Sequence, residues 1–159
     1  MGPDGDLVAD RFRRGCLCFA VWLEGGIAGY GWLSTGPEWI GEIQLEIKPR
    51  QREAYIWNCV TVPEHRRKGV FRSLVTGMSL AARRLGMKRV WIGSVAIPAE
   101  KALAPIGFEP ALRFDSVAIA GLHVMRVTRG ANRSLAADAS SAIGVRPGLV
   151  IQGSHPRCH

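Results

Sequence analysis

The sequence predicts an α/β domain whose sheet is mixed and mostly antiparallel. Residues 16–23 and 27–34 are apolar and flank a Glu-Gly-Gly turn, which is typical of an antiparallel hairpin. Residues 55–62 (YIWNCVTV) have the aromatic and β-branched composition of a buried strand. A helical repeat over 70–85 and a further strand over 89–95 follow it. Two strands joined by a helix run parallel, so we expect a central parallel pair flanked by helices.

The segments before the central strand extend the predicted sheet. Residues 1–14 are polar, and we expect them to be loose or to form a single turn. In the second hairpin strand, Gly29 and Gly31 predict a bulge or a close approach of another chain segment. Residues 43–47 alternate apolar and polar, which predicts a strand and an antiparallel meander of two to four strands.

The segments after the central helix predict the end of the domain. Gly86 stands where a left-handed helix cap is expected. Pro98 favours a short helix, which Pro105 and Gly107 limit. A closing hairpin is expected from 108–114 and 117–127, turning near 114–116. We therefore assign residues 1–127 to one domain, with its core at 16–127, and 128–159 to a weakly structured tail rich in Gly, Ala, Ser and Arg. Within that tail, 144–152 favour one strand.

Composition narrows the classes of protein. The chain has 159 residues, of which 47% are hydrophobic and 21% charged, as in ordinary globular proteins. No apolar run approaches the ~20 residues of a membrane helix, and the N-terminus does not resemble a signal peptide. We therefore expect a cytoplasmic protein that does not bind membranes. The four cysteines show no disulfide framework and no paired zinc-ligand spacing, so no metal is predicted.

The positive charge is concentrated in the middle of the chain. The net charge is +8, and more than half of the 21 Lys and Arg residues lie between 48 and 89. Such a bias suits nucleic acid or a cofactor that carries phosphates. Nucleic acid is the less favoured partner because the sequence has no motif for reading bases.

A basic loop connects the central strand to the helix. It holds Arg66, Arg67, Lys68 and Gly69 immediately before the helical repeat begins at Val70. Backbone N–H groups without partners, the helix dipole, a glycine and three cations together form a site able to hold a diphosphate. The alternative interpretation is a solvated, charged turn.

The order of residues in this stretch resembles a known motif. The sequence V-T-V-P-E-H-R-R-K-G-V-F-R-S-L is similar to the acetyl-CoA-binding motif of the GNAT superfamily of N-acetyltransferases, a strand ending in V-x-P followed by Q/R-x-x-G-x-G/A and a long helix. Arg66, Gly69 and Phe71 fall on its three marked positions, and Phe71 replaces the usual Gly or Ala. The resemblance extends from about residue 16 to 127, where Gly107-Phe108-Glu109-Pro110 is similar to the family's Gly-Phe ending.

The resemblance implies where acetyl-CoA binds. The backbone of the central strand, at Cys59, Val60 and Val62, would hold the pantetheine arm in the gap between two splayed strands. The loop and first helical turn would hold the diphosphate with the residues Arg66, Arg67, Lys68, Gly69, Val70, Phe71 and Arg72. The resemblance also implies that the N-terminal strand and helices of the family are shortened or missing here, and it allows a homodimer.

The residues that would carry the chemistry match the family less well. Direct attack of an amine on the thioester needs a base or a water chain. Glu53 is the first candidate, with a solvated carboxylate at the end of the strand as the alternative, and Asn58 is a candidate for orienting water or substrate. Leu103 stands where relatives carry a tyrosine acid.

The function that we expect is therefore acetyl transfer from acetyl-CoA to an amine of a small molecule or a protein. The competing interpretation is a catalytically weak or inactive acyl-CoA-binding module. Leu103 and the absence of carboxylates at Trp57 and Asn58 favour that alternative.

Overall fold

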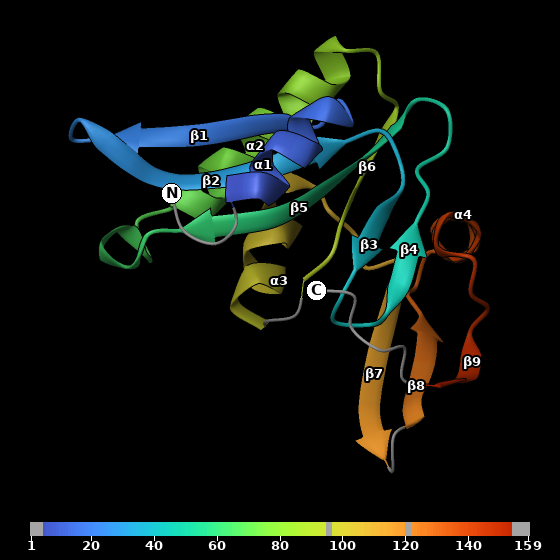
Figure 1. The fold of residues 1–159 in the computed structure, drawn as a ribbon. Coiled ribbons are helices and arrows are strands. Elements are labelled where there is room, and N and C mark those ends of the chain that lie inside the picture. The colour runs from blue at the N-terminus through green and yellow to red at the C-terminus, as the bar shows by residue number, and fades with distance from the viewer. Residues whose placement is uncertain (1–4, 95–96, 120–121, 154–159) are drawn as a thin grey trace. The chain divides into compact units, whose positions relative to one another are not determined.

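The computed structural model describes residues 5–94, 97–119 and 122–153. The chain forms two compact units. One comprises Met1–Glu38 with Lys48–Phe108, and the other comprises Trp39–Ile47 with Glu109–His159. The first unit contains the predicted strand–loop–helix stretch, and Figure 1 shows the elements of both units in order of sequence.

The sheet of the first unit confirms the predicted fold class. Its strands have the order β1-β2-β5-β6, in which β1–β2 and β2–β5 are antiparallel and β5–β6 is parallel. The bounds are β1 (Leu17–Leu23), β2 (Gly26–Ser34), β5 (Glu53–Thr61) and β6 (Arg89–Ile92). The parallel pair follows from the strand–helix–strand order, as the sequence predicts.

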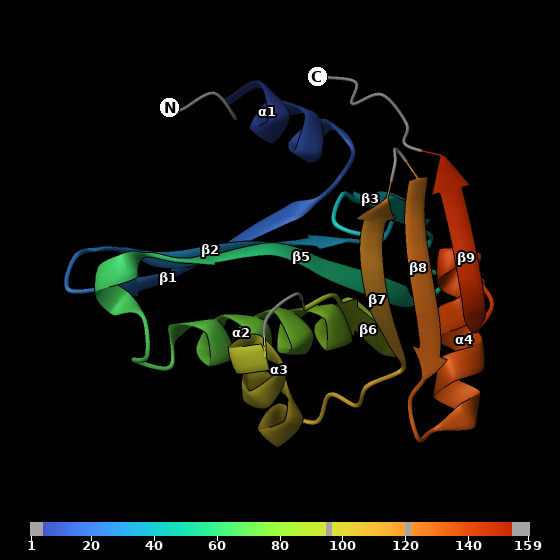
Figure 2. The same ribbon diagram turned by 90° about the horizontal axis from the view of Figure 1, so that it is seen from below.

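Helices cover both faces of this sheet. Helix α2 (Val70–Arg84) and helix α3 (Ile97–Leu103) lie on one face, and helix α1 (Gly5–Arg13) lies on the other (Figure 2). One-turn 3-10 helices, η1 (Pro63–His65) and η2 (Ala104–Ile106), precede α2 and follow α3. The apolar side of α2 packs on the sheet through Val70, Leu74, Val75, Met78 and Ala82, all buried.

Two predictions about glycines in this unit are confirmed. Gly86 has φ +82 just after α2, in the left-handed region that ends many helices. At Gly31 an added Cβ would lie 2.9 Å from the sulfur of Cys59 and 3.0 Å from a methyl group of Met78. The close approach of β5 and α2 to β2 therefore requires glycine at this position.

The N-terminal expectation is wrong, because residues 5–13 form helix α1 rather than a loose segment. Arg13 pairs with Asp10 one turn before it. The helix is held to the sheet by Arg11 and by Phe12, whose ring meets Trp32 edge-on at 5.1 Å between centroids. The polar composition of residues 1–14 concealed this helix, because a charged residue, Arg11, provides part of its contact with the sheet.

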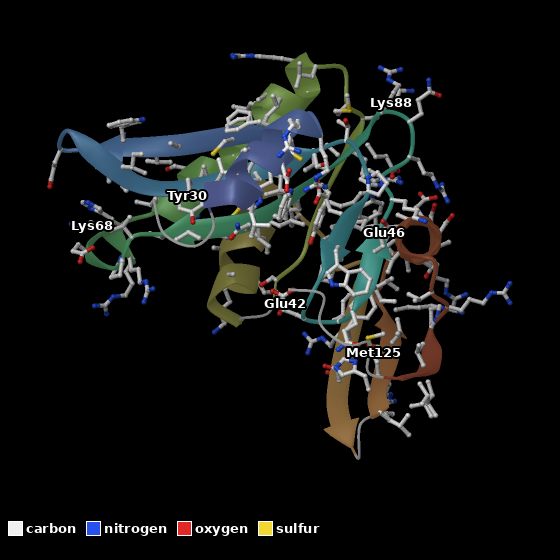
Figure 3. The ribbon with its side chains drawn as sticks, in the orientation of Figure 1. Tyr30, Glu42, Glu46, Lys68, Lys88 and Met125 are labelled. Atoms are coloured by element: carbon white, nitrogen blue, oxygen red, sulfur yellow. The ribbon has the colours of Figure 1, made fainter. Side chains whose placement is uncertain are left out.

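The second unit combines a three-stranded antiparallel sheet with a helix. Its elements are β7 (Leu112–Ile119), β8 (Leu122–Arg129), helix α4 (Arg133–Ile143) and β9 (Gly148–Gly153), with sheet order β7-β8-β9. A separate two-stranded sheet joins β3 (Glu38–Ile40) to β4 (Leu45–Ile47). Met125, labelled in Figure 3, is fully buried in a cluster with Leu45 and Val127.

The predicted turn of the closing hairpin is wrong. The structure has one continuous strand over residues 112–119, and the register pairs Ile119 with Leu122. Asp115, which suggested a turn, lies opposite Arg126 in mid-strand. A cross-strand pair of opposite charges suits a strand, and the sequence alone does not identify that partner.

The strand expected over 43–47 is shorter and pairs elsewhere. Only Leu45–Ile47 is extended, and its partner is β3 rather than a strand of the β1-β2-β5-β6 sheet. The alternation of the segment is real, but periodicity does not specify the partner strand.

The range assigned to a weakly structured tail contains regular structure. Asn132 caps α4, because its side-chain oxygen accepts a hydrogen bond from the Leu135 N–H. Gly144 ends the helix with φ +74. The buried side of α4 consists of the small residues Ala136, Ala139 and Ala142, and this Ala-rich composition is what suggested a weakly structured tail. The division of the chain at residue 127 stays a prediction.

Candidate active site

Strand β5 loses its parallel neighbour halfway along its length. Its pairing with β6 covers Glu53–Ile56, whereas its pairing with β2 continues to Thr61. The β2 register passes from Trp32↔Trp57 to Tyr30↔Val60, which leaves two β5 residues opposite Gly31. This is a β-bulge, and Asn58 within it has φ +45. Among the residues that the structure describes, no strand pairs with this edge of β5 past Ile56, so its backbone is available to an extended ligand.

The residues predicted to hold pantetheine lie along this open edge. Cys59 and Val60 follow the bulge, and Val62 precedes η1. The Cys59 side chain packs against the buried core of α2 and β2, so its backbone is the part that a ligand can reach. Burial raises the pKa of the Cys59 thiol to about 12. The thiol is therefore protonated at neutral pH and is unsuited to nucleophilic attack.

The loop after β5 has the backbone geometry of an anion site. Arg67 has φ +62, and Gly69, which precedes α2, has φ +81 with no side-chain cap. The N–H of Ser73 is the one that bonds to the Gly69 carbonyl, at 3.0 Å. The N–H groups of residues 70–72 come before it, and in an α-helix such groups have no partner within the helix. The first turn contains no acidic residue that would repel an anion.

The side chains of the loop leave space around this helix start. Arg66, Arg67 and Lys68 are exposed, and Lys68 lies in the loop between β5 and α2 (Figure 3). A Cβ built on Gly69 would meet no atom within 4 Å. Phe71, the departure from the motif, lies in the first turn of α2, and its partly buried side chain packs against the hydrophobic core.

Glu53 is buried and hydrogen-bonded, whereas a catalytic base needs a carboxylate that is free to take a proton. It is 7% exposed at the start of β5. Its carboxylate accepts hydrogen bonds from the Arg50 N–H (3.1 Å), the Arg89 guanidinium (3.0 Å) and the Trp91 indole N–H (2.8 Å). Asn58 lies five residues further along the strand, or about 16 Å. The structure therefore does not bring the two candidate catalytic residues together.

Asn58 lies beside a cluster that the sequence did not predict. With its amide oriented so that the oxygen faces Arg11, that oxygen accepts from both terminal guanidinium nitrogens, at 2.8 and 3.1 Å. The same guanidinium carbon lies 5.1 Å from the ring centroid of Trp32 and 4.5 Å from that of Trp57. No sequence signal links residue 11 to the bulge, because the link depends on where α1 lies.

The usual source of an acid is missing. Leu103 is 6% exposed and belongs to the hydrophobic core of the first unit. The position at which the resemblance implies a tyrosine therefore serves packing.

Comparison with known families identifies the class of protein. The model of the acetyltransferase (GNAT) family matches residues 3–105, and the chain belongs to this family. The match ends three residues before the end of the first unit at Phe108. No curated protein matches the chain.

Solved structures share the fold at low sequence identity. A putative acetyltransferase from Agrobacterium tumefaciens is 19% identical, with a TM-score of 0.51 over 68% of this chain and 72% of that one. A putative acetyl transferase from Pyrococcus furiosus is 18% identical, with a TM-score of 0.52 over 72% and 73%. A Bacillus subtilis acetyltransferase in complex with CoA is 22% identical, with a TM-score of 0.51 over 72% and 64%.

Two features of the described residues bear on other functions. Within residues 5–94, 97–119 and 122–153, no helix is both long and apolar enough to cross a membrane. The same residues contain no group of three His, Cys, Asp or Glu side chains placed to hold a metal ion.

Proposed function

We propose that this protein is an N-acetyltransferase that transfers an acetyl group from acetyl-CoA to an amine by direct attack. The observation that carries the proposal is that the open edge of β5 past Ile56 leads within a few residues to the uncapped start of α2. The pantetheine arm of CoA is extended and contains amides that suit the strand edge, and the diphosphate at its end suits the helix start.

The cofactor would lie along this path. Pantetheine amides would pair with the β5 backbone at Cys59, Val60 and Val62. The diphosphate would accept from N–H groups between Arg67 and Arg72, and the Arg66 side chain would add attraction. The shared fold of a Bacillus subtilis acetyltransferase in complex with CoA supports this assignment.

In the proposed reaction, the amine nitrogen forms a bond to the thioester carbon while the carbon–sulfur bond breaks. A backbone N–H of β5 near the bulge would stabilise the negative charge on the thioester oxygen. CoA would leave as a thiolate and take its proton from solvent, since Leu103 supplies none. The amine would lose its proton to water, because the Glu53 carboxylate already accepts three hydrogen bonds and the Asn58 oxygen accepts two from Arg11.

A second candidate function follows from Leu103. A chain without the tyrosine acid could bind acyl-CoA without turning it over. The two proposals differ in whether CoA thiol is released.

The test is a continuous assay of thiol release from acetyl-CoA with a panel of primary amines, with products identified by mass spectrometry. Amine-dependent release together with an acetylated amine supports the transferase. Calorimetric binding of acetyl-CoA without release supports the binding module. Absence of binding by folded protein contradicts both.

A further inference from the structure

Arg11 is a half-buried cation without an anionic partner in the described part of the chain. The two other arginines near the end of α1 each have one. Arg13 pairs with Asp10. Arg14 pairs with Glu38 at 3.0 Å. Charges that are partly withdrawn from water are normally paired with a charge of opposite sign, so Arg11 is a candidate for binding an anion.

The hydrogen bonds of Arg11 are also incomplete. With the Asn58 amide oriented so that its oxygen faces Arg11, this oxygen accepts from Nη1 at 2.8 Å and from Nη2 at 3.1 Å. A guanidinium has five N–H donors, and the remaining donors of Arg11 have no acceptor among the residues that the structure describes. Because the oxygen lies between the two terminal nitrogens, the edge formed by Nε and one terminal nitrogen is left for another acceptor. A carboxylate accepts two parallel N–H bonds from such an edge.

The two tryptophans that contact Arg11 carry further donors without acceptors. The guanidinium carbon is 5.1 Å from the Trp32 ring centroid and 4.5 Å from the Trp57 centroid. Within residues 5–94, 97–119 and 122–153, the indole N–H groups of both rings are buried and have no hydrogen-bond partner. Trp32 is 2% exposed, and an unpaired buried donor is costly. Every group that lacks a partner around this guanidinium is a donor, so the ligand that suits the place is an acceptor of hydrogen bonds.

The unpaired cation lies beside the part of β5 that would hold the thioester. Trp57 and Asn58 are the residues at which β5 leaves β6 and bulges. Since Asn58 is itself a hydrogen-bond partner of Arg11, an anion bound to Arg11 would be close to this backbone. Helix α1 lies on the face of the sheet opposite α2 (Figure 2). The anion would therefore be on the side of the sheet that the α2 start does not occupy.

An exposed apolar pair adjoins this place. Tyr30 and Val60 face each other across β2 and β5 just past the bulge, and both are 36% exposed. Tyr30, labelled in Figure 3, shares a face of β2 with Trp32, about 7 Å along the strand. The Cys59 side chain packs against the core on the α2 side, so Val60 points to the other face, where α1 lies. A ligand with its anionic group on Arg11 can therefore place an apolar group against this pair.

We propose that Arg11 binds the carboxylate of the acceptor and that the acceptor is an α-amino acid with an apolar side chain. This inference rests on the proposed acetyl transfer. The carboxylate would accept from the remaining edge of the guanidinium, and the apolar side chain would lie against Tyr30 and Val60. One carbon separates the amine of an α-amino acid from its carboxylate, so a carboxylate on Arg11 keeps the amine near the bulge.

The experiment is calorimetric titration with three related amines, each with and without saturating CoA. L-phenylalanine carries the carboxylate, L-phenylalaninamide has a neutral amide in its place, and phenethylamine lacks the group. L-phenylalanine should bind at least about tenfold more tightly than either of the others, because only its carboxylate forms a charge-assisted pair with Arg11.

A variant and a matched control assign this preference to one side chain. Arg11→Gln should bind L-phenylalanine at least about tenfold more weakly and lose the preference over phenethylamine. Arg13→Gln should behave like the unaltered protein, because Arg13 is on the same helix but is paired with Asp10. Thermal unfolding of each variant verifies that it is folded.

Two results would overturn the proposal. One is the absence of any preference for L-phenylalanine over phenethylamine in the unaltered protein, a comparison that needs no variant. The other is a preference that persists in folded Arg11→Gln. Separate titration with acetyl-CoA keeps the two proposals distinguishable. Failure of folded protein to bind acetyl-CoA counts against the transferase, whereas the amine series without CoA tests the carboxylate site by itself.

Discussion

Gly69 and Gly86 allow the anion site to be tested with a matched control. The two glycines flank helix α2 and have almost the same backbone conformation, with φ +81 and φ +82. A Cβ built on either would meet no atom within 4 Å. Substitution by Gln therefore imposes the same left-handed strain at both positions, about 1–2 kcal/mol. Thermal midpoints should fall by similar amounts, about 2–4 °C for each kcal/mol.

Only one of the two substitutions should weaken the binding of acetyl-CoA. Gly69 precedes the N–H groups that would receive the diphosphate, whereas Gly86 lies at the opposite end of α2. Gly69→Gln should weaken acetyl-CoA binding at least about tenfold, or ~1.4 kcal/mol, because its side chain would fill the space of the diphosphate. Gly86→Gln should leave affinity unchanged. Calorimetric titration measures both. Unaltered affinity in folded Gly69→Gln, or equal losses in the two variants, would refute the diphosphate site at the start of α2.

Three further predictions concern stability and catalysis. Burial raises the pKa of Cys59 to about 12 from 9.0, so the folded state holds this proton more tightly than the unfolded state. This contribution to the free energy of unfolding is complete below pH 9 and is lost as the pH rises toward 12. Denaturant titrations above pH 9 should therefore show that the free energy of unfolding falls with pH more steeply in the unaltered protein than in Cys59→Ala, by up to about 1.4 kcal/mol per pH unit. Glu53→Gln should destabilise by about 1–3 kcal/mol, because it weakens the bonds with Arg89 and Trp91. If the role of Glu53 is structural, kcat per folded molecule of Glu53→Gln stays unchanged. A large loss of kcat with unchanged acetyl-CoA affinity would instead indicate that Glu53 is the catalytic base. Met78→Ala should cost about 2–5 kcal/mol in urea unfolding, since Met78 is fully buried under the sheet, and a smaller loss would mean that the site collapses.

Local sequence patterns predicted the first unit well. The composition of residues 55–62, the helical repeat after Val70 and Gly86 as a left-handed cap each depend on neighbours close in sequence. The structure confirms these features as β5, α2 and φ +82. The parallel β5–β6 pair then follows from the handedness and length of the connection.

The features that the sequence did not predict depend on partners far along the chain. Asp115 suggested a turn because its partner across the strands, Arg126, is unknown without the register. Asn58 was identified, but the bulge that contains it depends on how β5 pairs with β2. The contacts of Arg11 with Trp57 and Asn58 require α1 to lie over that bulge, and polar residues at the N-terminus give no sign of where the helix packs.

The most direct test of the proposed cofactor site is calorimetric titration of the whole chain with acetyl-CoA beside dephospho-CoA. We predict micromolar binding of acetyl-CoA. Dephospho-CoA should lose less than about tenfold in affinity, because the diphosphate and pantetheine contacts remain. Absence of binding by protein shown to be folded would contradict the assignment of the β5 edge and the α2 start to the cofactor.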